Sequence, residues 1–197
     1  TTLPIGGLIA VIADSGAEDA AIDALGARFE VEFVPEAAAE GPVPQQVKVG
    51  GRRINYLVMG DGDATPLVLI HGFGGDLSTW MFNQAALAEA RPVIALDLPG
   101  HGASDKNVGA GDVPAFAEVV LGLLDDLAIA RAHLAGHSLG GAVALEMALA
   151  NPGRIASLTL LAPAGLGCEI DGGYIVGFIA ADRRKAAKEV LGRLVHD

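Results

Sequence analysis

Short apolar runs bounded by turn residues recur along the chain after residue 44. A continuous apolar run of about four residues is typical of a strand buried on both faces of a parallel sheet. Two apolar stretches that flank Gly50-Gly51, at residues 47–49 and 54–59, predict a β-hairpin. The buried strands are expected at residues 67–70, 93–96, 133–135 and 156–161.

Helical spacing is found between and after these runs. Residues 113–127 place apolar side chains at steps of three and four, with acidic residues on the opposite face. Another helix is expected over residues 174–197. Strands that alternate with helices predict a mostly parallel sheet with helices on both faces.

The first 44 residues follow a different pattern. A β-like run at residues 8–12 precedes Asp14-Ser15-Gly16 and an acidic, helix-like segment in which Ile22 and Leu25 are apolar. Residues 35–44 are rich in Pro, Ala and Glu and have no apolar period, which is typical of a linker. We therefore expect three zones: residues 1–34, a linker at 35–44 and a domain at 45–197.

Composition narrows the possible functions. The 197 residues include 13 Lys and Arg against 24 Asp and Glu, a formal net charge of −11. Such a charge argues against a nucleic-acid partner and against a basic membrane-binding surface. The single cysteine, Cys168, excludes an internal disulfide and fits a reduced, cytoplasmic location.

Targeting signals are not evident either. No apolar run approaches the roughly 20 residues that span a bilayer, and the run at residues 8–13 is too short and lacks the basic leader of a secretory signal. The chain begins without Met inside a strand-like segment. We therefore expect it to be a piece of a longer parent protein.

The strongest chemical motif is Gly136-His137-Ser138-Leu139-Gly140-Gly141, which lies where a predicted strand ends and a predicted helix begins. In a nucleophile elbow a strained turn pushes the serine hydroxyl out above the sheet. Side chains at positions 136 and 140 would collide with this turn, so glycine at both positions is expected. The motif predicts that Ser138 is a nucleophile.

Two further glycine-rich loops follow predicted strands. His71-Gly72-Phe73-Gly74-Gly75 follows residues 67–70, and Asp97-Leu98-Pro99-Gly100-His101-Gly102-Ala103-Ser104 follows residues 93–96. In the second loop we expect Asp97 to tie the turn through side-chain hydrogen bonds, so a structural role is favoured for Asp97 and His101 over a catalytic one.

These three blocks, in this order and spacing, resemble the α/β-hydrolase superfamily over residues 45–166. The resemblance implies an α/β-hydrolase fold with a mostly parallel sheet, truncated before its last strands at the start of the cap region. It also implies an oxyanion hole formed by the backbone N–H groups of Phe73 and Leu139 beside Ser138. The residues expected to shape the elbow and the turn are His71, Gly72, Gly136, His137 and Gly140.

In that superfamily an acid and then a histidine follow the nucleophile along the chain, each after a later strand. Neither a second acidic strand end nor a Gly-His loop follows residues 156–161. His137 is expected to support the elbow while facing away from the Ser138 hydroxyl, and His196 lies at the end of the last predicted helix. We therefore expect the catalytic acid and histidine to be absent from this chain, which would be inactive alone although its parent is active.

Residues 2–29 resemble the closing part of a lipoyl domain, a flattened β-sandwich, and residues 3–14 match its last strands. A lipoyl domain joined by a linker to an α/β hydrolase resembles the dihydrolipoamide acetyltransferase (E2) components of acetoin dehydrogenase complexes. Residues 178–191, at the start of the cap region, resemble the same family. The stretch at residues 30–45 is too short for the peripheral-subunit-binding module of ordinary E2 proteins.

The resemblance implies a lipoyl group, attached to a lysine upstream of this chain, that delivers an acetyl thioester. Ser138 would pass the acetyl group to coenzyme A. The implied partners are the E1 and E3 components of a multienzyme complex, with a homo-oligomeric parent. No metal, nucleic acid or membrane is implied.

Two alternatives to acyl transfer remain open. The same motifs occur in hydrolases of esters or of carbon–carbon bonds in ring-cleavage products, and the domain could also be a non-catalytic scaffold. A second choice concerns the cationic residues of the last predicted helix, which either attract coenzyme A phosphates or form a solvated face. These residues are Arg183, Arg184, Lys185 and Lys188.

Overall fold

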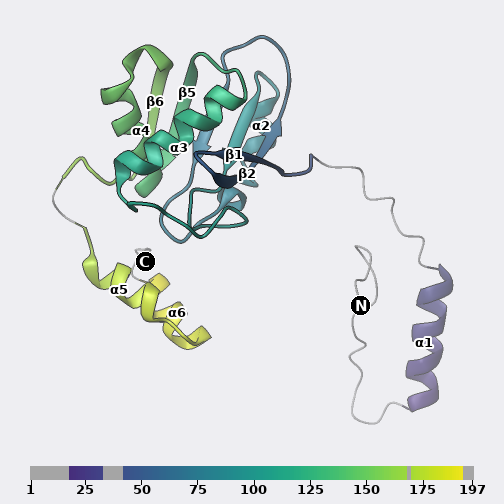
Figure 1. Cartoon of the computed structure of the whole chain (residues 1–197). Coiled ribbons are helices and arrows are strands. Elements are labelled where there is room, and N and C mark those ends of the chain that lie inside the picture. Colours follow the sequence, from purple (N-terminus) through teal and green to yellow (C-terminus); the bar gives the residue numbers. More distant parts are fainter. Residues whose placement is uncertain (1–17, 33–41, 168–169, 193–197) are drawn as a thin grey trace. The chain divides into compact units, whose positions relative to one another are not determined.

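The computed structural model describes residues 18–32, 42–167 and 170–192 (Figure 1). The chain divides into two compact units, Thr1–Val43 and Pro44–Asp197. In the first unit the predicted acidic helix is confirmed as α1, Asp19–Glu32, whose Asp19 lies in the first turn. The predicted β-like run at residues 8–12 and most of the predicted linker lie outside the described residues.

The second unit is built on a six-stranded sheet with the strand order β1-β2-β4-β3-β5-β6. The strands β3 to β6 are parallel, whereas β2 is antiparallel to both of its neighbours, β1 and β4. The predicted hairpin, the buried runs of β3, β4 and β5 and the mostly parallel sheet are confirmed. The run at residues 156–161 was expected to be buried as well, but after Ile155 the residues of β6 alternate between half-buried and exposed, because β6 is the last strand in the order of the described sheet. The strands are β1 Gln45–Val49, β2 Arg52–Met59, β3 Leu67–Ile70, β4 Val93–Leu96, β5 Ala132–His137 and β6 Ile155–Leu161.

Alternate residues of the central strands lie in two separate apolar clusters. Val68 and Ile94 belong to the larger cluster, and Leu69 and Ala95 belong to the smaller one. Successive side chains of a strand point to opposite faces, so the two clusters are the two sides of the sheet. This burial on both faces explains why β3 and β4 contain no polar position.

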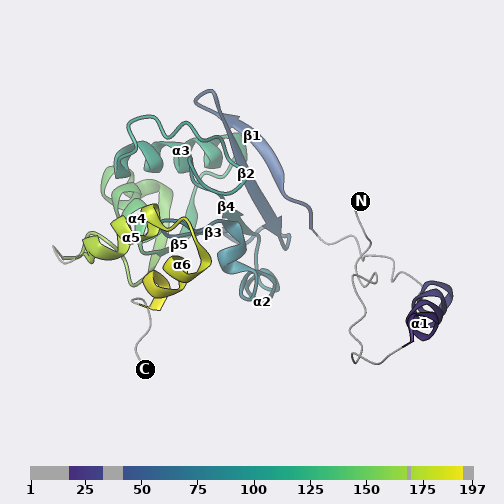
Figure 2. The ribbon, with the colours of Figure 1, turned by 90° about the horizontal axis from the view of Figure 1, so that it is seen from below.

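Helices cover both faces of this sheet. α3, Val113–Asp126, and α4, Leu139–Ala150, pack against each other and supply residues to the larger cluster (Figures 1 and 2). The other face receives a 3-10 turn at Leu77–Trp80, named η1, and the short helix α2, Gln84–Ala88. A second 3-10 turn, η2, spans Pro152–Arg154. Within the described residues no helix is long and apolar enough to cross a membrane.

The prediction of one helix over residues 174–197 is wrong. Two helices are present instead, α5 at Gly172–Ala180 and α6 at Arg184–Leu191, and residues 193–197 lie outside the described part. Ala181 and Arg183 both have extended backbone. α6 packs back on α5, where a Cβ added to Gly177 would lie 2.9 Å from a methyl group of Val190. Folding back lets apolar side chains of α6 such as Val190 pack against α5, which one straight helix could not do.

Candidate active site

Ser138 stands on a strained turn between β5 and α4. Its backbone angles are φ = 51° and ψ = −114°, a conformation that is uncommon for a residue with a side chain. Neighbouring backbone groups hold it there. Its N–H donates to the Leu161 carbonyl at 3.1 Å, and its own carbonyl accepts from the N–H groups of Gly141 at 3.0 Å and Ala164 at 2.9 Å.

The glycines on either side of Ser138 allow the close contacts of this turn. A Cβ added to Gly136 would lie 2.3 Å from the Gly140 carbonyl oxygen, and one added to Gly140 would lie 2.2 Å from the Ile70 carbonyl oxygen. Both contacts are with backbone, which cannot rotate away. Glycine is therefore required at both positions, as the sequence predicted.

The loop after β3 passes directly beside the nucleophile. A Cβ on Gly72 would lie 3.1 Å from the Ser138 Cβ and 2.9 Å from His137 Nδ1. The next residue along this loop is Phe73. In the described part of the chain, no hydrogen bond engages the N–H of Phe73 or of Leu139, the first residue of α4. Two backbone donors therefore lie near Ser138 without a protein acceptor.

His71 fixes the start of this loop. It is fully buried, and its Nε2 accepts a hydrogen bond from the Leu98 N–H at 3.0 Å. Nδ1 therefore carries the proton and donates to the Gly72 carbonyl at 2.7 Å. Desolvation by burial lowers the pKa of His71 and outweighs the opposing effect of the Gly72 hydrogen bond. A neutral His71 thus joins the loop after β3 to the loop after β4.

Asp97 ties the loop after β4, as the sequence predicted. Its carboxylate is buried and accepts hydrogen bonds from Asn55 Nδ2 at 2.9 Å, the Leu77 N–H at 2.7 Å and the Ala103 N–H at 2.8 Å. His101 places Nδ1 3.0 Å from the Pro99 carbonyl within the same loop. Neither side chain has a hydrogen bond to Ser138, so the structural role is supported.

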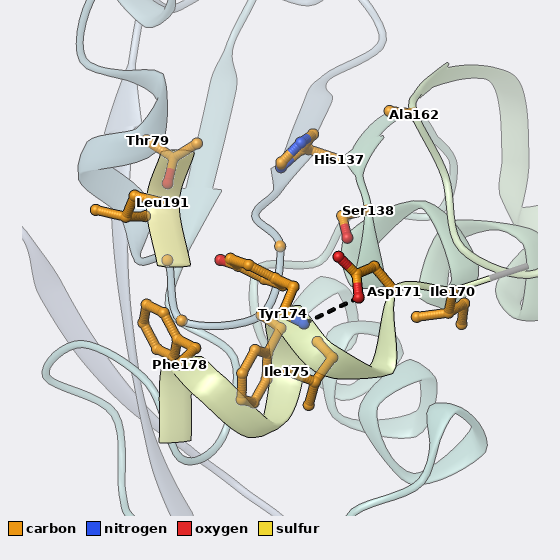
Figure 3. A pocket seen from close by; sticks show the side chains of 14 residues that line it. Thr79, His137, Ser138, Ala162, Ile170, Asp171, Tyr174, Ile175, Phe178 and Leu191 are labelled. Carbon is orange, nitrogen blue, oxygen red and sulfur yellow. Dashed lines mark hydrogen bonds between the residues drawn. The ribbon is translucent and has the colours of Figure 1, made fainter. Parts of the chain in front are cut away.

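Ser138 opens into a cavity of about 520 Å³ between the loops and α5 (Figure 3). The α5 residues Tyr174, Ile175 and Phe178 line it, and the Tyr174 N–H donates to the N-cap Asp171 at 3.1 Å. The sequence analysis did not identify these side chains as site residues. The available signal was an apolar α5 with aromatic residues four positions apart. The remaining lining residues are Gly72, Phe73, Gly74, Gly75, Thr79, His137, Ala162, Ile170, Asp171 and Leu191.

A second cavity, of about 410 Å³, lies on another side of the nucleophile and is mainly apolar. Phe73 and Ser138 line both cavities, so the serine stands where the two chambers meet. Phe116 of α3 and Val108 wall the second chamber. The other lining residues are His101, Gly111, Leu139, Ala164, Ile170 and Ile175.

No general base is joined to the nucleophile within the described residues, where no hydrogen bond links the Ser138 hydroxyl to a histidine or carboxylate. His137 is exposed and lines the larger cavity, but its ring and the Ser138 hydroxyl point in different directions (Figure 3). His196 lies outside the described residues. No group of three or more His, Cys, Asp or Glu in the described part is placed to hold a metal ion.

Comparison with known proteins gives two relatives that match essentially the whole of this chain. The chain is 53% identical over 199 residues to the dihydrolipoyllysine-residue acetyltransferase component of the acetoin cleaving system of Pseudomonas putida, matching 100% of this chain and 54% of the relative. The component of the same name from Cupriavidus necator is 38% identical over 196 residues, matching 99% of this chain and 52% of the relative. The expected resemblance is confirmed, and the chain spans about half the length of these relatives.

The fold has solved counterparts. The meta-cleavage product hydrolase of Pseudomonas fluorescens IP01 superposes with a TM-score of 0.69 at 26% identity, over 75% of this chain and 55% of that one. The profile of the alpha/beta hydrolase fold matches residues 65–191, more than half of the chain. With its strained serine between a parallel strand and a helix, this chain belongs to the α/β-hydrolase fold family.

Proposed function

We propose that this chain carries the nucleophile of an acyltransferase, which moves an acetyl group from lipoamide to coenzyme A within an acetoin-cleaving multienzyme complex. The observation that carries the proposal is the match over the whole chain to the two acetyltransferase components, including the residues before the hydrolase-fold unit. The strained backbone of Ser138 supports the covalent step, because it holds the hydroxyl at the meeting point of both cavities.

The proposed reaction has two halves. The Ser138 oxygen attacks the thioester carbonyl carbon while its proton passes to a base, and the resulting oxyanion accepts hydrogen bonds from the Phe73 and Leu139 N–H groups. Collapse breaks the carbon–sulfur bond and releases the dihydrolipoamide thiol with that proton. The thiol of coenzyme A then attacks the acetyl-serine ester, and the serine regains a proton as acetyl-coenzyme A leaves. The catalytic acid and histidine are proposed to lie outside this chain.

The same proposal assigns the first unit. Residues 1–34 would be the closing part of a lipoyl domain, with the lipoyl lysine upstream, and residues 35–44 the linker that lets the arm reach the site. The E1 and E3 components as partners, a homo-oligomeric assembly and a cytoplasmic location belong to this proposal. α1 is the part of this unit that the structure describes.

Hydrolysis of esters or of carbon–carbon bonds is the second candidate. It is favoured by the likeness to a meta-cleavage product hydrolase and by the mainly apolar second cavity beside Ser138. Water would then replace the thiol of coenzyme A as the acceptor.

The test measures acetyl transfer from acetyl-dihydrolipoamide to coenzyme A with the purified full-length protein. Ser138→Ala should lower the rate at least about a thousand-fold, because it removes the attacking oxygen. Thr159→Ala is the control, since it removes an exposed hydroxyl that lines neither cavity.

Three outcomes would contradict parts of the proposal. Full activity in Ser138→Ala would exclude the covalent serine. Rapid hydrolysis of p-nitrophenyl acetate with no acetylation of coenzyme A would favour the hydrolase. Absence of both activities in the wild-type protein would favour the non-catalytic scaffold.

A further inference from the structure

Phe178, near the end of α5, lies on the glycine-rich loop that follows β3. A Cβ added to Gly74 would lie 2.6 Å from Phe178 Cζ, so the ring covers the Gly74 backbone directly. The same ring meets the Phe73 ring edge-on, with centroids 5.6 Å apart and an interplanar angle of 67°. Phe178 therefore connects α5 to Phe73 and Gly74. Phe73 carries the N–H group that is proposed to donate to the oxyanion.

This loop has little of its own to hold it in shape. Three of the five residues in His71-Gly72-Phe73-Gly74-Gly75 are glycine, and Gly74 has φ = 73°, in the left-handed region. One backbone hydrogen bond closes the turn, from the Gly75 N–H to the Gly72 carbonyl at 3.1 Å. Because glycine reaches many backbone conformations, an external contact is needed to select one direction for the Phe73 N–H.

The sheet side of the loop already has such a contact. The Phe73 ring packs edge-on against His101 at 6.1 Å, and the His101 ring lies 5.0 Å from that of His71. Backbone hydrogen bonds hold both histidines. Phe73 is therefore in contact with His101 and with Phe178, while Tyr174 supports Phe178 at 5.9 Å.

We propose that Phe178 is a positioning residue that sets the oxyanion hole by clamping the loop at Phe73 and Gly74. The seating of α5 over the site then also orients a catalytic donor. The inference rests on the proposed function, because it requires that the Phe73 N–H stabilises the oxyanion. It applies to transfer and to hydrolysis alike, since both pass through the same tetrahedral oxyanion.

The first test is single-turnover acylation of the full-length protein by p-nitrophenyl acetate. Phe178→Ala should lower the acylation rate constant about 10- to 100-fold. This is less than the roughly 10²- to 10³-fold loss that follows removal of one oxyanion donor, because the Phe73 N–H is misplaced and not removed. Affinity for phenylboronic acid, which forms a tetrahedral adduct with the serine, should fall by a similar factor. Phe178→Tyr, which keeps the ring, should restore most of the rate.

The matched control is Ile179→Ala on the same helix, because Ile179 is 71% exposed and lines neither cavity. It should leave the rate and the boronate affinity unchanged. A Phe178→Ala protein that changes only KM, or only the melting temperature, would overturn the inference. If wild-type acylation survives Ser138→Ala, the proposed function fails instead, so the two failures are distinguishable.

A double-mutant cycle tests the clamp itself. Gly74→Ala drives a methyl group into the Phe178 ring and also strains a left-handed backbone, so its rate should fall. In the Phe178→Ala background the ring is absent, so Gly74→Ala should lower the acylation rate constant by a factor that is several-fold smaller. Equal losses in both backgrounds would show that Phe178 does not act on the loop.

Discussion

The buried His71 makes the stability of this protein depend on pH. Its folded pKa lies below the ordinary value of 6.5, because burial disfavours the imidazolium, whereas the unfolded chain has the ordinary value. The unfolded state therefore binds the proton first as the pH falls. This contribution to the free energy of unfolding is complete above pH 6.5 and is lost as the pH falls from there through the folded pKa.

We therefore expect the urea concentration at the unfolding midpoint to decrease as the pH is lowered from about 7.5 to about 5.5. The decrease should be smaller in His71→Gln, because a glutamine side chain at position 71 does not titrate in this range. Protonation would also end the acceptance of the Leu98 N–H by Nε2. Parallel pH curves for the two proteins would show that the loss arises at other groups.

The glycine contacts at the elbow predict a second residue-level effect. Gly140→Ala places a methyl group against the Ile70 carbonyl, so α4 and β3 must separate around the nucleophile. We expect a loss of about 1–3 kcal/mol in the free energy of unfolding, as in other overpacked sites, together with a loss of acylation activity. Gly153→Ala is the matched control, because a Cβ there meets nothing within 4 Å. Similar behaviour of the two variants in denaturant titrations and acylation assays would contradict the steric explanation.

At the level of elements, α6 offers a test of the two interpretations of the cationic residues. Leu191 lines the larger cavity, and Lys188 and Arg184 lie three and seven residues before it, on the same helical face. Lys185 lies on a different face, beside a shallow hollow with Asp182 and Glu189. Coenzyme A phosphates bound at the mouth of the cavity would therefore meet Lys188 and Arg184 and not Lys185.

We expect Arg184→Glu and Lys188→Glu to raise the KM for coenzyme A several-fold at low salt and less at high salt, because exposed charges are screened. Turnover of p-nitrophenyl acetate should not change. Lys185→Glu makes the same charge change on the other face and should have little effect on KM. An equal effect of all three variants, or none, would favour a solvated face.

At the level of the whole molecule, the proposed linker leads to a prediction about how the acetyl group reaches the serine site. If residues 35–44 tether a lipoyl arm to the serine site, they set its effective concentration there. Deleting these residues should slow transfer from the protein-bound lipoyl group, while the rate with free acetyl-dihydrolipoamide stays the same. A Gly-Ser segment of equal length should restore the rate. A deletion that slows both reactions equally would point to damage of the hydrolase-fold unit.

Much of the fold was predictable from local pattern. β3 and β4 begin and end where the apolar runs do, because strands buried on both faces admit no polar position between turn residues. The Gly-x-Ser-x-Gly spacing likewise located the elbow, since its contacts are with backbone and only glycine satisfies them. In contrast, η1 and α2 have four and five residues, too few turns to show a helical period.

The break between α5 and α6 had no local signal of Gly or Pro at residues 181–183. We attribute the break to the packing of Val190 on Gly177. These residues are far apart along the chain, so the local pattern fits one straight helix as well as two helices folded on each other. The Phe178 contact with Gly74 is of the same kind. It joins residues about a hundred positions apart, and no spacing rule links them.

The sequence by itself determined the class of fold, the position of the nucleophile and the glycines around it, because each depends on neighbours within a few residues. Only the tertiary structure decided the order of the strands, the two chambers that meet at Ser138 and the aromatic contact that holds the loop after β3. These depend on which distant segments pack together, and that choice follows from burial and shape over the whole sheet.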